Sequence, residues 1–220
     1  MYHRYVNSLV ARAQVVAVSV GYRLAPEHRL PAAYDDSWAA LAWAVSSGSD
    51  PWLARHGDLG RVFLVGVSAG GNAAHNMAVH GRLPSPVVVE GVALLHPSFS
   101  GEQRMTEEED EAFWRANNER WRIIFPGAGG ADDPRINPTA AGAPNLAKLA
   151  GERLLVCTAS EDPRAPRAKA YAEAVRDSGW RGEVEWFESE GEGHGFFVLN
   201  PGTRTAEELM DRVDAFIAGR

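Results

Sequence analysis

A serine in a glycine-flanked motif has the surroundings of an activated nucleophile. Gly66-Val67-Ser68-Ala69-Gly70 matches G-x-S-x-G. An expected strand at 61–66 precedes it, and a small-residue segment with helical spacing, 69–80, follows it. A strand that turns at once into a helix exposes its serine at the sheet edge, and the helix N-terminus directs N–H groups toward developing negative charge. The pattern predicts that Ser68 is a nucleophile. A phosphate-binding P-loop would need a lysine where this chain has Asn72.

Ser68 needs a base to take its proton, and the base needs an acidic group to orient it. On strand–turn–helix nucleophile scaffolds the three residues follow one another as Ser, acid, His. Asp162 comes just after an expected strand at 154–158, and His194 after one at 184–187. Loops at the carboxyl ends of parallel strands share one edge of the sheet. We therefore predict Asp162 as the acid and His194 as the base.

Two neighbours are alternatives to these assignments. His96 ends an expected strand at 91–95 and is the main rival base, although it precedes any acidic loop. Glu161 adjoins Asp162 and is the second choice for the acid, because its longer side chain fits the geometry less well. Asp162-Pro163 taken alone is explained equally well by a simple turn.

Other residues carry weaker signals. An ester pocket or the packing of a surface segment would explain five aromatic side chains equally well: Phe99, Trp114, Trp121, Phe125 and Phe196. The acidic run at 107–111 is typical of a solvated face or a helix N-terminus. Cys157, in mid-strand, is expected to be a small core residue. No metal site and no cofactor are predicted.

Composition excludes several classes of function. The chain has 220 residues and a formal net charge of −7, which disfavours a nucleic-acid partner. A single cysteine cannot form an internal disulfide. No apolar run approaches the ~20 residues that cross a bilayer, and no secretory leader is visible at the start. We expect a cytoplasmic protein that acts on a small molecule, without a membrane partner; the oligomeric state is not predicted.

The elements that must position these side chains alternate between helical and strand patterns, which predicts an α/β fold with a mostly parallel sheet. Beyond the segments above, a strand is expected at 15–20, and helices are expected at 35–45, 107–124, 167–178 and 206–218. The stretch 97–150 interrupts the alternation. We interpret residues 1–220 as one domain with a cap-like insertion at about 97–150.

Four segments together resemble the plant carboxylesterases of the hormone-sensitive-lipase-like group of α/β-hydrolases. The segments are Tyr22-Arg23-Leu24-Ala25-Pro26-Glu27-His28, Gly66 to Asn72, Asp132-Asp133-Pro134-Arg135-Ile136-Asn137-Pro138, and Trp186 to His194. They extend over nearly the whole chain. The resemblance implies the α/β-hydrolase fold, with Ser68, Asp162 and His194 as a catalytic triad. It also implies that the Ala69 N–H group contributes to an oxyanion hole.

The sequence departs from the family in three respects. Gly21 and Val67 stand where relatives usually carry Asp. The family's His-Gly-Gly-Gly motif, whose glycine N–H groups make most of the oxyanion hole, is absent from the 220 residues. The resemblance therefore implies an N-terminally truncated sheet that lacks its first strands. Either the strands at 15–20 and 61–66 now pair directly, or the sheet has a gap that exposes backbone groups.

These observations predict a serine carboxylesterase that hydrolyses small carboxylic esters through an acyl-enzyme. Two alternatives belong to other classes. One is a non-catalytic ligand receptor on the same fold, as in the gibberellin receptors that the family resembles; those receptors lack the triad histidine and need an N-terminal lid. The other is an inactive truncated product.

Overall fold

The fold is built on a four-stranded parallel sheet. A computed structural model describes residues 2–46, 50–80, 87–108 and 110–219. The strands are β1 (Val62–Val67), β2 (Val89–Leu95), β3 (Arg153–Ala159) and β4 (Glu183–Ser189). They lie side by side in the order β1-β2-β3-β4, and every neighbouring pair is parallel. Four of the five strands expected from the sequence are therefore confirmed, and so is the α/β class.

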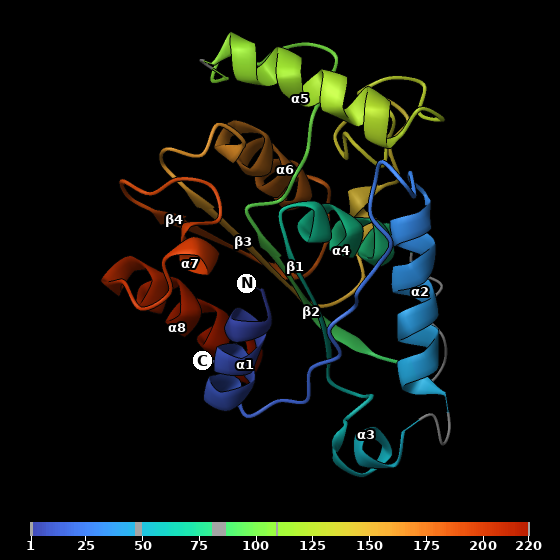
Figure 1. The fold of residues 1–220 in the computed structure, drawn as a ribbon, viewed down its shortest axis with the longest axis vertical. Coiled ribbons are helices and arrows are strands. Elements are labelled where there is room, and N and C mark those ends of the chain that lie inside the picture. The colour runs from blue at the N-terminus through green and yellow to red at the C-terminus, as the bar shows by residue number, and fades with distance from the viewer. Residues whose placement is uncertain (1, 47–49, 81–86, 109, 220) are drawn as a thin grey trace.

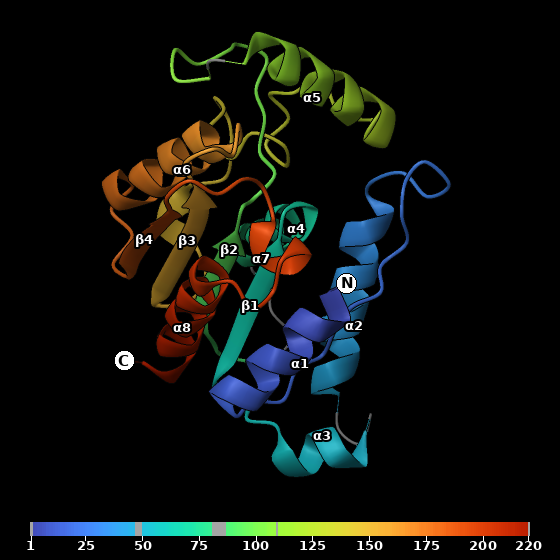
Figure 2. The same ribbon diagram turned by 60° about the vertical axis from the view of Figure 1, so that its left-hand side comes forward.

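Helices cover both faces of the sheet (Figures 1 and 2). The helical segments are α1 (Tyr2–Ala13), α2 (Ala32–Val45), α3 (Pro51–His56), α4 (Ala69–His80), α5 (Glu111–Ile124), the 3-10 turn η1 (Leu146–Lys148), α6 (Ala165–Asp177), α7 (Phe196–Leu199) and α8 (Arg204–Ala218). Alternate residues of β2 and β3 point to opposite faces and enter different cores. Ala93, Leu95 and Leu155 pack with α1, α7 and α8, whereas Val92 and Leu94 pack with α4 and α6. None of the helices in the described ranges is long and apolar enough to cross a membrane.

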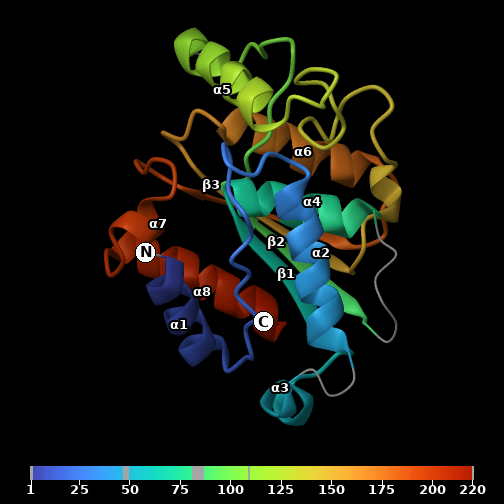
Figure 3. The same ribbon diagram turned by 45° about the vertical axis from the view of Figure 1, so that its right-hand side comes forward.

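The strand expected at 15–20 is not formed. Residues 15–24 have no regular secondary structure, and β1 is hydrogen-bonded only to β2. A strand exists only where a neighbour accepts and donates its backbone hydrogen bonds, so β-branched composition without an adjacent strand leaves an extended, hydrated segment. In Figure 3 this segment passes between α1 and α2 along the β1 side of the sheet. Val18 and Val20 of the segment and Val65 of β1 are exposed. Neither arrangement left open by the sequence is found in the described residues, because both include a strand at 15–20.

The segment 97–150 carries α5, which lies beyond the carboxyl ends of the strands (Figures 1 and 2). The helix begins at Glu111, one turn later than expected, because the Asp110 side chain accepts the Phe113 N–H group and caps it there. Trp121 of α5 and Phe125, which follows the helix, pack with Tyr34 of α2 and Ala73 of α4. The interpretation of 97–150 as a cap-like insertion within one domain stays a prediction.

Candidate active site

The turn from β1 into α4 holds Ser68 in a constrained conformation. Ser68 has a φ of 55°, in the left-handed region. Its N–H group donates to the Leu95 carbonyl at 2.9 Å, and its carbonyl accepts the Ser98 N–H group at 3.0 Å. A Cβ on Gly66 would lie 2.0 Å from the Gly70 carbonyl oxygen, so this position requires glycine. A Cβ on Gly70 would meet nothing within 4 Å. The first glycine of the motif is therefore needed for packing, whereas the second is not.

Because a left-handed conformation costs an L-residue about 1–2 kcal/mol, the nucleophile position stores strain. Glycine removes this strain but loses about 0.5–1 kcal/mol more backbone entropy on folding than alanine does. We expect the free energy of unfolding of Ser68→Gly to exceed that of Ser68→Ala by about 0.5–1 kcal/mol. Urea unfolding of the two variants, both of which lack the hydroxyl, measures this difference. Equal stabilities, or a more stable alanine variant, would contradict it.

Three side chains from different loops form a continuous chain of hydrogen bonds. The Ser68 hydroxyl lies 2.9 Å from Nε2 of His194. Nδ1 of His194 lies 2.7 Å from Oδ2 of Asp162. Ser68 follows β1, Asp162 follows β3, and His194 follows β4. The carboxyl ends of these parallel strands meet at one edge of the sheet, which explains why residues up to 126 positions apart come together.

The Asp162 carboxylate is fully buried and accepts several hydrogen bonds. Oδ2 faces His194 and also Nδ1 of His96, 2.9 Å away, and Oδ1 accepts the Arg164 N–H group at 3.0 Å. Burial alone would raise the pKa of Asp162, but the hydrogen bonds from the two imidazoles and from the Arg164 backbone outweigh it and hold the pKa well below its usual range. Asp162 is therefore an ionised acceptor. The alternative acid, Glu161, is exposed to solvent.

The lowered pKa of Asp162 links its ionisation to folding. Because the folded-state pKa lies below that of the unfolded chain, ionised Asp162 stabilises the fold above about pH 4, and this contribution is lost as the pH falls toward the folded-state pKa. We expect the unfolding free energy to fall below about pH 4. The Asp162→Asn variant has no carboxylate to protonate at this position. The difference in unfolding free energy between the wild-type protein and Asp162→Asn should therefore become smaller as the pH falls. Urea unfolding at a series of pH values between about 2 and 6 tests this expectation. If the unfolding free energies of the two proteins changed in parallel with pH, the expectation would be contradicted.

His96, the rival base, does not contact Ser68 in any hydrogen bond of the described residues. Its Nδ1 lies instead beside Oδ2 of Asp162, and its ring centroid is 5.5 Å from that of His194. His96, Asp162 and His194 have the composition of a metal site, with ligand atoms within 4.8 Å of one another. Their direct contacts of 2.7 and 2.9 Å are shorter than the separation of about 3.3 Å between two ligands of one tetrahedral zinc ion. The arrangement therefore suits hydrogen bonding through Nδ1–H groups better than metal binding.

Backbone donors for a developing oxyanion would have to come from the start of α4. Ala69 is the first residue of this helix and is exposed. Its N–H group belongs to the first turn, whose N–H groups have no intrahelical carbonyl partner. The Ala69 N–H group thus lies next to Ser68 on an exposed side of the turn, and its part in an oxyanion hole stays a prediction.

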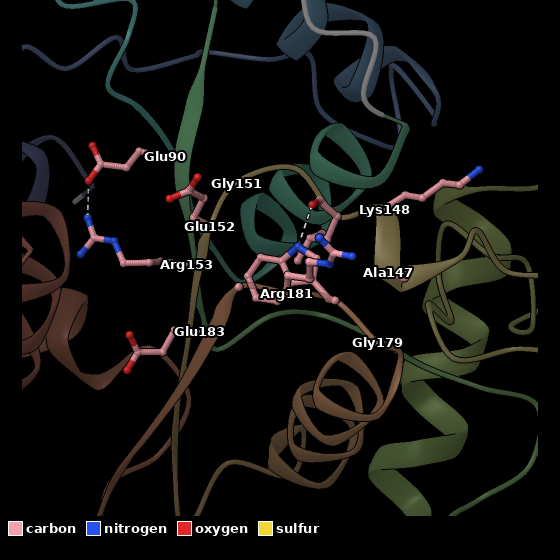
Figure 4. A pocket seen from close by; sticks show the side chains of 12 residues that line it. Glu90, Ala147, Lys148, Gly151, Glu152, Arg153, Gly179, Arg181 and Glu183 are labelled. Atoms are coloured by element: carbon pink, nitrogen blue, oxygen red, sulfur yellow. Dashed lines mark hydrogen bonds and ion pairs between the residues drawn. The ribbon is translucent and has the colours of Figure 1, made fainter.

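One hollow of the described structure lies away from the triad. It has a volume of about 650 Å³ and opens at the amino ends of β2, β3 and β4, opposite the edge that carries Ser68 (Figure 4). Glu90, Arg153 and Glu183 mark the starts of these strands, and Arg153 donates to Glu90 at 2.6 Å. Its lining mixes acidic and basic side chains, with no group in position to take part in the chemistry at Ser68.

Comparison with known proteins identifies the family. The profile of a family described as alpha/beta hydrolase fold matches residues 1–198. The chain belongs to the α/β-hydrolase family. This assignment agrees with the parallel sheet, with the turn from β1 into α4 at Ser68, and with the resemblance carried by the four sequence segments.

Relatives of this α/β-hydrolase come from plants. The chain is 40% identical over 230 residues to 2-hydroxyisoflavanone dehydratase of Glycyrrhiza echinata, a match that covers 99% of this chain and 70% of the relative. It is 42% identical over 223 residues to tuliposide A-converting enzyme 1, chloroplastic, of Tulipa gesneriana, with 99% of this chain and 57% of the relative covered. The chain therefore spans 57% to 70% of the length of these relatives.

A solved structure supports the same family. The crystal structure of the esterase LipW from Mycobacterium marinum has a TM-score of 0.79 and 28% identity with this α/β-hydrolase, and the match covers 99% of this chain and 67% of that one. The resemblance to the hormone-sensitive-lipase-like carboxylesterases is thus confirmed at the level of sequence relatives and of fold.

Most of the weaker sequence signals of this α/β-hydrolase have structural explanations. Phe99 is buried against His75 and Tyr171, and Phe196 packs on His96. Cys157 is buried in β3, as expected. The acidic run is not wholly solvated: Glu108 is buried and accepts hydrogen bonds at 2.8 and 2.9 Å from Arg167 of α6. Glu109 lies outside the described residues.

Proposed function

We propose that this protein is a serine carboxylesterase that hydrolyses small carboxylic esters through an acyl-enzyme. The observation that carries the proposal is the unbroken chain of hydrogen bonds from Ser68 through His194 to Asp162, at 2.9 and 2.7 Å. These distances and the order of the three residues along the chain match what nucleophilic serine catalysis requires. The esterase names of the structural relatives favour esters over other acyl compounds.

The geometry assigns each residue a role in the reaction. Since ionised Asp162 can only accept hydrogen bonds, Nδ1 of His194 carries a hydrogen and Nε2 presents its lone pair to the Ser68 hydroxyl. Nε2 takes the hydroxyl proton as Oγ attacks the ester carbonyl, and then delivers it to the departing alkoxide. Nε2 then takes a proton from water as the water oxygen attacks the acyl carbon. The bond from this carbon to Oγ of Ser68 breaks, Nε2 returns the proton to Oγ, and the acid is released. Asp162 stabilises the imidazolium that forms in each half-reaction.

Stabilisation of the tetrahedral intermediate is the weakest part of this site. The Ala69 N–H group is one donor, and the family resemblance places the others in a His-Gly-Gly-Gly motif that the 220 residues do not contain. Loss of a single oxyanion donor costs ~10²–10³ in turnover. We therefore expect slow hydrolysis by this chain, although its nucleophile and base are in position.

The experiment that tests the proposal compares two chains on short-chain p-nitrophenyl esters. One is the 220-residue chain, and the other carries an added segment with a His-Gly-Gly-Gly motif before Tyr2. We expect the longer chain to have a kcat higher by at least ~10²-fold, because it gains oxyanion donors. Equal rates would contradict our account of the oxyanion hole. Gibberellin binding without ester turnover by either chain would overturn the enzyme proposal in favour of a receptor.

A further inference from the structure

The triad acid has a second imidazole partner that the reaction scheme above does not use. Nδ1 of His96 lies 2.9 Å from Oδ2 of Asp162, the same oxygen that faces His194. The side chains of His96 and Asp162 are both 0% exposed, whereas that of His194 is 26% exposed. Oδ2 therefore lies between one wholly buried histidine and one that reaches the reacting serine.

The chemistry of the carboxylate determines the tautomer of His96. Ionised Asp162 is an acceptor only, so a hydrogen bond to it at 2.9 Å requires a hydrogen on Nδ1 of His96. The Gly195 N–H group lies 3.5 Å from the same Nδ1. It cannot donate a hydrogen bond there, because an Nδ1 atom that carries a hydrogen offers no lone pair. Nε2 of His96 is buried without a hydrogen-bond partner among the described residues. A second N–H at that atom would be unsatisfied, so the neutral ring protonated on Nδ1 is the form that fits.

The backbone of His96, which carries this ring, is in a strained conformation. His96 directly follows β2 and has a φ of 50°, a left-handed conformation that is uncommon for residues other than glycine and enriched in histidine and asparagine. Its N–H group is fixed to the Cys157 carbonyl at 2.7 Å. The ring packs beside those of Phe196 and Phe197, with centroid distances of 5.9 and 5.4 Å. Strained residues held by their surroundings concentrate at functional sites.

We propose that His96 is a positioning residue that fixes the Asp162 carboxylate so that Oδ2 faces His194. The proposal rests on the proposed esterase function. A carboxylate held only by His194 on Oδ2 and by the Arg164 N–H group on Oδ1 can turn about its Cβ–Cγ bond, and His194 then loses the orientation that directs Nε2 at Ser68. The donor at Nδ1 of His96 opposes this rotation. His96 makes no hydrogen bond to Ser68 in the described structure and acts through Asp162, so its effect should be on kcat rather than on KM.

Two substitutions separate the hydrogen bond from the packing. His96→Leu fills the space and removes the donor, and His96→Asn places an amide N–H close to the position of Nδ1 and tolerates a positive φ. A hydrogen bond to a charged group contributes about 1.5–3 kcal/mol, so we expect kcat of His96→Leu to fall about 10- to 10²-fold with KM nearly unchanged. His96→Asn should remain within about threefold of the parent chain, because it keeps the donor. Wild-type kcat in a folded His96→Leu variant would overturn the proposal.

NMR of the resting protein with ¹⁵N-labelled histidine gives a readout that does not depend on turnover. We expect His96 to carry its hydrogen on Nδ1, and the Nδ1–H signal of His194 to persist in His96→Asn but to broaden in His96→Leu. If esters are never hydrolysed and these signals behave as described, the positioning role stands and the esterase proposal fails. A hydrogen on Nε2 of His96 in the wild-type chain would overturn the positioning role even if His96→Leu does not fold.

Discussion

Replacing Ser68 with alanine is expected to lower ester hydrolysis by about 10⁴-fold or more, to what binding and any remaining oxyanion donor can supply. In the described residues, the hydroxyl is the only group at hydrogen-bond distance from Nε2 of His194. No other side chain is therefore placed to act as a nucleophile by giving its proton to Nε2. Because alanine keeps the backbone conformation of the turn, the loss should fall on kcat. Hydrolysis of a p-nitrophenyl ester measures it.

Ser98 provides a matched control for the Ser68 variant. It lies close by in the fold, since its N–H group donates to the Ser68 carbonyl at 3.0 Å, but it makes no hydrogen bond to His194 in the described structure. We expect Ser98→Ala to keep nearly full activity. If Ser68→Ala retained the parent rate, or if Ser98→Ala lost as much as Ser68→Ala, Ser68 would not be the nucleophile.

Replacing Asp162 with asparagine is expected to lower kcat about 10⁴-fold, because the wrong tautomer of the histidine is then favoured. The N–H donors around both oxygens of Asp162 add to this loss, because an asparagine side chain cannot accept from all of them. Oδ1 faces the N–H group of Arg164 at 3.0 Å, and Oδ2 faces two imidazole nitrogens at 2.7 and 2.9 Å. An amide has one acceptor oxygen and one donor nitrogen, so either orientation sets its NH₂ group against an existing N–H donor.

The matched control for Asp162 is its neighbour. Glu161 is exposed and is tied to the histidine loop only through its backbone, whose N–H group donates to the Glu192 carbonyl at 3.0 Å. Glu161→Gln should therefore keep its activity within about twofold, as surface substitutions generally do. Steady-state kinetics of both variants tests the assignment of Asp162 as the acid. A large loss of kcat in Glu161→Gln with a small loss in Asp162→Asn would identify Glu161 as the acid instead.

The sequence was sufficient to predict those parts of the fold that depend on local pattern. The short apolar runs became β1 to β4, of which the central strands β2 and β3 are buried on both faces. The small residues after Ser68 form α4. Gly179 follows α6 with a φ of 84°, in the left-handed conformation expected of a helix terminator. The order Ser, acid, His singled out the three side chains that the structure brings within hydrogen-bond distance, while their catalytic roles stay a proposal.

Features that depend on long-range partners could not be predicted. The segment 15–20 has the composition of a strand, but whether it forms one depends on a neighbour that local sequence does not specify. Glu108 lies in an acidic run that suggests solvent exposure, yet Arg167, 59 residues away, makes it a buried ion-pair partner. His96 drew attention only as a rival base. Its contact with Asp162 arises because β2 and β3 are adjacent, which a single sequence does not reveal.

Covalent labelling tests most directly whether Ser68 is a nucleophile activated by His194 and Asp162. A fluorophosphonate reacts with an activated serine and needs no complete turnover, so slow hydrolysis does not obscure the result. The protein would be treated with the probe, digested, and the adduct located by mass spectrometry. We predict a single adduct on Ser68, absent from Ser68→Ala and formed much more slowly in Asp162→Asn. Labelling at another serine, or no labelling of folded protein, would contradict the account.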